Sequence, residues 1–262
     1  MSDSRREIVT SADGTAIAVS ITGDGPPLVV CPGSLSTAAD WQAVADELAP
    51  IATTYAIDRR GHGASGDGAE YALAREQEDL TAVLDHAGPE ATLMAHSFGA
   101  VVALRLPLTR RPARFAVYEP PLPFAGPVGG PALDDYEAAL DAGDPDRALT
   151  IGLTHFVRLP DRHIDGYRRT ADWAVKAART PLWTREVRAL DALDPDPRPY
   201  AAIDVPTLLL TGQASPPWLT DVVAHLHATI PDTRIAHLTA QGHWANSLAP
   251  AAVAAELRRF IA

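Results

Sequence analysis

A serine between small residues is the first candidate for chemistry in this chain. Ser97 is the centre of the pentapeptide 95–99, which reads AHSFG. The apolar run 91–95 predicts a buried strand, and the apolar run 100–106 has the length of a helix. A nucleophile on a strained strand-to-helix turn needs small neighbours where the two backbone arms converge. The pattern therefore predicts that Ser97 is a nucleophile.

A serine hydroxyl needs an adjacent base, and that base needs an orienting acid. Among nine histidines, His243 stands just after the last predicted strand, 234–238, in the sequence AQGHW. His96 flanks the serine but should point away from it. We expect His243 to be the base, and a loop histidine without a catalytic role is the competing interpretation.

The strand-turn-helix context of Ser97 resembles the α/β-hydrolase superfamily, although Ala95 replaces the usual first glycine. The stretch 58–65, DRRGHGAS, is similar to the turn that braces the site after the fourth strand in that superfamily. The position of His243 also matches the catalytic histidine of these proteins. The resemblance covers nearly the whole chain and implies the order serine, acid, histidine.

The position of the orienting acid differs from the position that is commonest in the superfamily. The loop 212–219, expected after the seventh strand, contains no carboxylate, and the next one is Asp221. A variant of the superfamily places the acid after the sixth strand, and Glu119 stands there. Neighbouring strands lie about 5 Å apart, so a carboxylate can approach from the next strand, and glutamate reaches one methylene further. We favour Glu119. The alternatives are Asp221 or no acid, with Glu119 paired structurally.

Two backbone amides are expected to hold the oxyanion. The first is the amide of Phe98, at the start of the predicted helix. By resemblance, the second follows the third strand in the sequence PGSLS, where Ser34 supplies the amide and Leu35 is a close alternative. Ser34 as an ordinary turn residue is the competing interpretation.

Predicted strands and helices alternate along most of the chain, which indicates a parallel sheet with helices on both faces. The resemblance implies an α/β-hydrolase fold with a mostly parallel eight-stranded sheet. Residues 1–120 and 200–262 are expected to form this core. Residues 121–199 show helical patterns without strand signals and are predicted to be an inserted helical cap.

Several large side chains are candidates for an apolar substrate pocket. Packing of cap helix against cap helix is the competing interpretation for each aromatic residue. The candidates are Leu35, Phe124, Tyr136, Phe156, Trp173, Trp183 and Trp218.

Composition excludes several classes of function. The chain has 262 residues, with 33 acidic and 22 basic side chains and a formal charge of −11. This balance argues against nucleic acid or an anionic membrane as a partner. One cysteine excludes a disulfide framework, and no spacing indicates a metal site. We expect a cytoplasmic protein without cofactor that acts on a small molecule. Its oligomeric state is not indicated.

The sequence therefore predicts a serine hydrolase for a small or medium, mainly apolar carboxylic ester, lactone or thioester, with an amide as a further possibility. A serine nucleophile argues against haloalkane dehalogenase or epoxide hydrolase activity, because those relatives use aspartate. The alternatives are a non-hydrolytic enzyme of the same fold (lyase, cyclase or carbon–carbon bond cleavage) and a ligand-binding pseudoenzyme.

Overall fold

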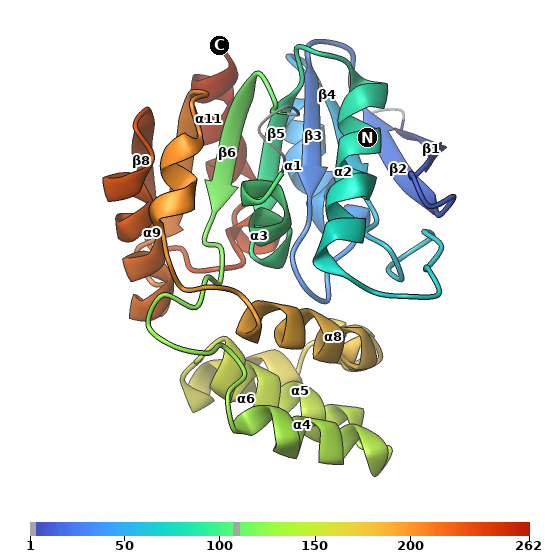
Figure 1. Cartoon of the computed structure of the whole chain (residues 1–262), viewed down its shortest axis with the longest axis vertical. Coiled ribbons are helices and arrows are strands. Elements are labelled where there is room, and N and C mark those ends of the chain that lie inside the picture. Colours follow the sequence, from blue (N-terminus) through green and yellow to red (C-terminus); the bar gives the residue numbers. More distant parts are fainter. Residues whose placement is uncertain (1–3, 107–110) are drawn as a thin grey trace. The chain divides into compact units, whose positions relative to one another are not determined.

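The computed structural model describes residues 4–106 and 111–262 and contains one eight-stranded sheet (Figure 1). The strand order is β1-β2-β4-β3-β5-β6-β7-β8. β1 pairs antiparallel with β2, β2 pairs antiparallel with β4, and the remaining neighbours are parallel. The predicted α/β-hydrolase fold is confirmed. The strands are β1 (Ser4–Thr10), β2 (Ala16–Thr22), β3 (Pro27–Cys31), β4 (Thr53–Ile57), β5 (Thr92–His96), β6 (Arg114–Tyr118), β7 (Thr207–Gly212) and β8 (Thr233–Leu238).

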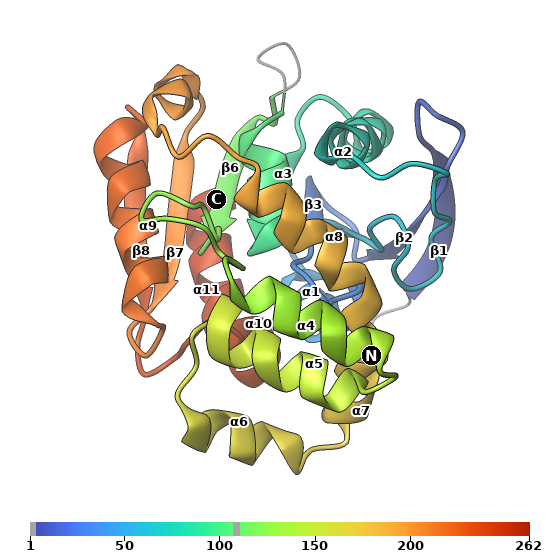
Figure 2. The ribbon, with the colours of Figure 1, turned by 60° about the horizontal axis from the view of Figure 1, so that its bottom comes forward.

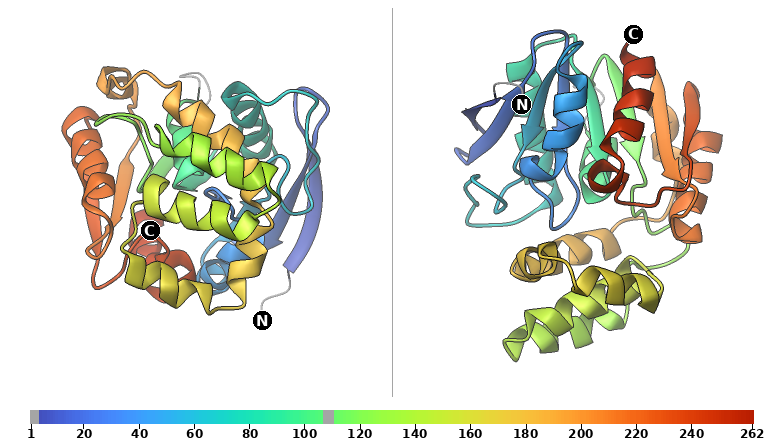
Figure 3. Two further views of the ribbon diagram at one scale, coloured as in Figure 1. Left: turned by 90° about the horizontal axis from the view of Figure 1, so that it is seen from below. Right: turned by 180° about the vertical axis from the view of Figure 1, so that it is seen from behind.

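Helices cover both faces of the sheet, which explains why the central strands read as continuous apolar runs. Every residue of β5 and β7 is buried. One face carries α2 (Leu73–Ala87), α3 (Phe98–Leu104) and α9 (Pro217–Thr229), as Figure 1 shows. The other face carries α1 (Gln42–Leu48) and α11 (Pro250–Ile261), which are visible from behind in the right panel of Figure 3.

The chain divides into two units. One comprises the chain up to Pro120 together with Pro197–Ala262, and the other is Pro121–Asp196. Short helices join the strands of the first unit. They are η1 (Ala38–Trp41), η3 (Arg198–Ala202) and α10 (Ala245–Leu248).

The second unit contains helices and loops, and its helices α4 (Ala132–Asp141) and α5 (Pro145–Ile151) lie side by side (Figure 2). The segment 161–178 has one continuous helical pattern in the sequence but forms two helices, because the chain turns at 169–171, where the Thr170 hydroxyl donates to the Tyr167 carbonyl. The segment 146–159 also has one helical pattern in the sequence, but it changes to a π-helical turn at Gly152, where a Cβ would lie 2.4 Å from the Trp183 ring. The elements are α4 (Ala132–Asp141), α5 (Pro145–Ile151), η2 (Gly152–Phe156), α6 (Asp161–Arg168), α7 (Asp172–Ala177) and α8 (Thr180–Asp191).

None of the described helices, over residues 4–106 and 111–262, combines the length and the apolar character that a membrane span requires.

Candidate active site

Ser97 occupies the sharp turn between β5 and α3. Its backbone has φ 52° and ψ −125°, a conformation that L-residues rarely adopt. Its amide donates to the carbonyl of Tyr118 at 2.9 Å, and its side chain is half-buried. At Gly99 a Cβ would lie 2.3 Å from the Pro32 carbonyl oxygen, so glycine is required there. The methyl group of Ala95 is tolerated and fully buried.

Glu119 and His243 contact each other directly. Glu119 follows β6, and its Oε2 lies 2.7 Å from Nδ1 of His243. Both residues are buried, with 0% and 6% exposure. The other carboxylate oxygen, Oε1, accepts hydrogen bonds from the Thr211 hydroxyl at 2.9 Å and the Gly212 amide at 2.7 Å. Both oxygens of the buried carboxylate are therefore hydrogen-bonded.

The end of β7 supplies hydrogen-bond donors to this carboxylate, and the acid itself comes from β6. A Cβ at Gly212 would lie 2.4 Å from the backbone oxygen of Gln241, so no side chain fits there. Asp221 is exposed on α9. Of the two acids considered from the sequence, Glu119 is the one in contact with His243.

Electrostatics keep the Glu119 carboxyl ionised. Burial raises its pKa, but the hydrogen bond and charge of His243, together with the Gly212 amide, outweigh burial and hold the pKa below the ordinary value. An ionised carboxylate only accepts hydrogen bonds, so the Nδ1–H of His243 donates to it. This arrangement leaves Nε2 of His243 as the ring nitrogen that can accept a proton.

Side chains from two strands hold the loop that carries His243. Nε2 of His96, in β5, donates to the backbone oxygen of His243 at 2.9 Å, and the two ring centroids are 4.6 Å apart. The Tyr118 hydroxyl, at the end of β6, donates to the carbonyl of Gly242. Burial raises the pKa of Tyr118, so the phenol keeps its proton. His96, the residue next to Ser97, thus holds the loop of His243 beside the turn that carries Ser97.

The predicted oxyanion segments adjoin Ser97. A Cβ at Gly33 would lie 2.7 Å from the Ser97 Cβ and 3.2 Å from its Oγ. Gly33 therefore packs closely against the turn that carries Ser97. Ser34 is half-buried, and Leu35 is buried with φ 57°. Phe98 is the first residue of α3 and is fully buried.

Three of the candidate pocket residues pack on one another inside the helical unit. The ring centroids of Tyr136 and Phe156 are 5.1 Å apart, and both rings meet Trp183, at 6.0 and 5.3 Å. Trp173 donates from Nε1 to Asp146 at 3.0 Å. These contacts form the core of the unit itself. Phe124 and Trp218 are half-buried.

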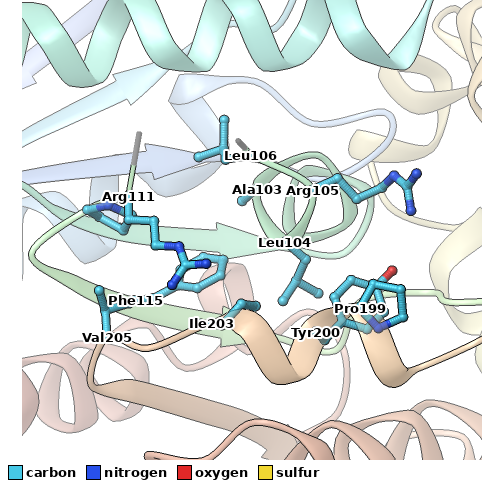
Figure 4. A pocket seen from close by; sticks show the side chains of 11 residues that line it. Ala103, Leu104, Arg105, Leu106, Arg111, Phe115, Pro199, Tyr200, Ile203 and Val205 are labelled. Atoms are coloured by element: carbon cyan, nitrogen blue, oxygen red, sulfur yellow. The ribbon is translucent and has the colours of Figure 1, made fainter. Parts of the chain in front are cut away.

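A separate cavity of about 220 Å³ lies at the other end of α3 from Ser97 (Figure 4). Its lining is mostly apolar, and the Arg111 side chain at its edge forms an ion pair with Asp204. None of the three predicted triad residues lines it. The lining residues are Ala103, Leu104, Arg105, Leu106, Arg111, Pro112, Phe115, Pro199, Tyr200, Ile203 and Val205.

Within residues 4–106 and 111–262, no group of three or more His, Cys, Asp or Glu side chains has the arrangement of a metal site.

Sequence reasoning missed the residues that hold the triad candidates in place. Thr211 and Gly212 hold Glu119, while Tyr118 and His96 hold the histidine loop. One signal was available, because polar residues at the carboxyl ends of β5, β6 and β7 must meet at one edge of the sheet. Their individual partners depend on loop conformation, which no spacing rule gives.

Comparison with known proteins places this chain in a family. Residues 28–256 match the alpha/beta hydrolase family. A crystal structure of an alpha/beta hydrolase from Sphaerobacter thermophilus is similar, with 34% identity, a TM-score of 0.87, and coverage of 98% of this chain and 100% of that one. The chain belongs to the alpha/beta hydrolase family.

More distant relatives differ in their named activities. N-formylmaleamate deformylase from Pseudomonas putida is 31% identical over 138 residues, which is 50% of this chain and 49% of the relative, so the match spans about half of its length. The esterase RhEst1 from Rhodococcus has 23% identity and a TM-score of 0.75, with 98% of both chains covered. The haloalkane dehalogenase DatA from Agrobacterium tumefaciens has 21% identity and a TM-score of 0.69, with 98% and 96% covered. The last two show likeness of fold alone.

Proposed function

We propose that this chain is a serine hydrolase that cleaves a small or medium, mainly apolar carboxylic ester, lactone or thioester. The observation that carries the proposal is the buried Glu119–His243 contact of 2.7 Å beside the strained turn of Ser97. A hydrogen-bonded carboxylate behind an imidazole is the arrangement that makes a histidine an effective base for a serine.

The reaction follows from these positions. His243 takes the proton of the Ser97 hydroxyl through Nε2 as the oxygen attacks the substrate carbonyl carbon. The amides of Phe98 and Ser34 stabilise the oxyanion. The imidazolium then protonates the leaving alcohol or thiol as the carbon–heteroatom bond breaks, which leaves an acyl group on Ser97. Water, deprotonated by His243, attacks the acyl carbon and releases the carboxylic acid and the free serine.

An N-formyl amide is the second candidate substrate, because the relative with 31% identity is named a deformylase. The same residues serve that reaction if the imidazolium protonates a leaving amide nitrogen. An ester and an N-formyl amide differ in the leaving group and share the nucleophile, so both can be tested on one preparation.

The proposal is tested with a fluorophosphonate probe and a series of nitrophenyl esters of increasing acyl length, followed by lactones and N-formyl amides. We expect a stoichiometric adduct on the peptide that contains Ser97, together with ester turnover, and Ser97→Ala should lose both. Adduct formation without turnover of any acyl substrate would favour a non-hydrolytic enzyme. Turnover by Ser97→Ala equal to that of the wild type would refute the proposal.

A further inference from the structure

A buried arginine connects the two segments that carry the proposed oxyanion donors. Arg59 lies two residues after β4 in the turn 58–65, and it is 1% exposed. Its Nη2 donates to the carbonyl oxygen of Gly33 at 3.4 Å. Its Cζ lies 4.8 Å from the centroid of the Phe98 ring. One guanidinium therefore contacts both Gly33, the residue before Ser34, and Phe98, the residue after Ser97.

The contact with Gly33 acts on the peptide that donates to the oxyanion. The Gly33 carbonyl and the Ser34 amide belong to the same planar peptide unit, so fixing the oxygen fixes the direction of the N–H. A cationic donor on the carbonyl also polarises the peptide, which strengthens its N–H as a donor. The guanidinium also lies over the Phe98 ring, and this contact anchors Phe98, whose amide is the other donor.

The position of the guanidinium is itself fixed. Nη1 of Arg59 donates to both carboxylate oxygens of Glu76 on α2, at 3.0 and 3.1 Å. Nη2 lies 3.1 Å from Nε2 of His62, and the Tyr71 hydroxyl donates to Glu76 at 3.0 Å. A planar fork can bind a carboxylate, a carbonyl and an aromatic face together, whereas a lysine ammonium cannot.

We propose that Arg59 is a positioning residue of the oxyanion hole, which orients the Gly33–Ser34 peptide and anchors Phe98. This inference rests on the proposed function, since it assigns those two amides to oxyanion binding. It gives the buried Arg59–Glu76 pair a role in catalysis in addition to any contribution to folding.

The test uses paired substitutions, because removing one member of a buried ion pair leaves an uncompensated charge. Arg59→Met with Glu76→Gln removes the pair under study. The matched control is Arg60→Met with Asp79→Asn. Arg60 is also fully buried in the same turn, and it binds Asp79 at 2.7 Å and Asp13 at 3.0 Å.

For each variant, kcat and KM are measured on the nitrophenyl ester that the wild type hydrolyses fastest. Inhibition is measured with a trifluoromethyl ketone that carries the same acyl chain as that ester. The ketone forms a hemiketal oxyanion on Ser97, so its affinity reports oxyanion stabilisation. Loss of a whole oxyanion donor costs about 100- to 1,000-fold in kcat. In the Arg59–Glu76 variant both donors remain but are misdirected, so we expect kcat to fall about 10- to 100-fold and ketone affinity to fall in parallel. KM should stay within about threefold of the wild-type value. The Arg60–Asp79 control should keep kcat and ketone affinity within about threefold.

Equal losses of kcat and ketone affinity in the two double variants would overturn the inference, because the role would then be structural. Arg59→Lys provides a second measurement if the double variant fails to fold. It keeps the charge opposite Glu76 but loses the fork, and it should also lose ketone affinity. Wild-type ketone affinity in Arg59→Lys would equally overturn the inference. Failure of the proposed function is distinct, because the wild-type protein would then show neither the fluorophosphonate adduct nor turnover.

Discussion

Replacing Glu119 with glutamine changes one atom of the buried carboxylate and should nearly abolish turnover. In the wild type, Oε1 accepts hydrogen bonds from Thr211 and Gly212, and Oε2 accepts the Nδ1–H of His243. The glutamine oxygen must take the Oε1 position, because two donors point at it. The NH₂ group then faces His243 and donates to Nδ1, which places the imidazole proton on Nε2. In that tautomer His243 cannot accept the Ser97 proton.

The contact between Glu119 and His243 also sets the size of the expected loss in rate. At 2.7 Å and an effective dielectric constant of about 20, a carboxylate stabilises the imidazolium by about 6 kcal/mol. At about 1.4 kcal/mol for each factor of ten, this corresponds to roughly 10,000-fold in rate. Loss of the acid in serine protease triads costs a similar factor. We therefore expect Glu119→Gln to lower kcat by about 1,000- to 10,000-fold.

The assay is steady-state turnover of a nitrophenyl ester together with the rate of fluorophosphonate labelling, since both require the Ser97 nucleophile. Nitrogen-15 NMR of the imidazole reports which nitrogen of His243 carries the proton. The matched control is Asp221→Asn, which alters an exposed carboxylate on α9 and should change kcat less than twofold. A folded Glu119→Gln protein with kcat within tenfold of the wild type would refute the reasoning. A large loss of kcat in Asp221→Asn would identify Asp221, on the helix after β7, as the acid.

Three further predictions concern the surroundings of these residues. Ser34→Ala should change kcat by less than about threefold, because the proposed donor is the backbone amide, and a loss like that of the Ser97 variant would contradict this. Tyr118→Phe removes the hydrogen bond to the Gly242 carbonyl and should lower kcat about tenfold with little change in KM, measured by steady-state kinetics. An unchanged kcat would show that the loop needs no such support. Because the pKa of Glu119 is lowered in the folded state, its ionised carboxylate stabilises the fold at any pH above the ordinary pKa of 4.5. This stabilisation is lost as the pH falls through the folded-state pKa. The free energy of unfolding, measured with urea, should therefore fall more steeply below pH 5 for the wild type than for Glu119→Gln. Parallel curves of this free energy against pH would contradict the assignment.

The sequence was most informative where a local pattern and the fold agree. The continuous apolar runs at β3, β5 and β7 predict buried parallel strands, and the small residues around Ser97 fit the turn that the structure shows. The pairing of Glu119 with His243 was predicted from the resemblance, and in the structure the glutamate side chain reaches the histidine although β7 lies between the two strands that these residues follow.

The features of the site and of the helical insertion that could not be predicted depend on contacts between residues that are distant in the sequence. The turn 58–65 was identified only by its resemblance to a turn that braces the site, and the contacts of Arg59 with Gly33 and Phe98 could not be predicted from its sequence. The helical insertion was predicted as helices, but the break at 169–171 and the π-helical turn at Gly152 follow from side-chain packing that periodicity does not contain. Aromatic residues proposed as pocket candidates, such as Tyr136, pack against other rings of their own unit.

Positive φ angles occur at the ends of two adjacent strands, 52° at Ser97 and 45° at Glu119. A non-glycine residue held in such a conformation costs of order 1–3 kcal/mol. Glycine adopts it readily, so each glycine variant should tolerate heat better than the matching alanine variant while being equally inactive. Two of the three residues to which we assign the chemistry thus adopt a backbone conformation that lowers the stability of the fold. Selection for thermostability alone would first replace the residues at these two strand ends.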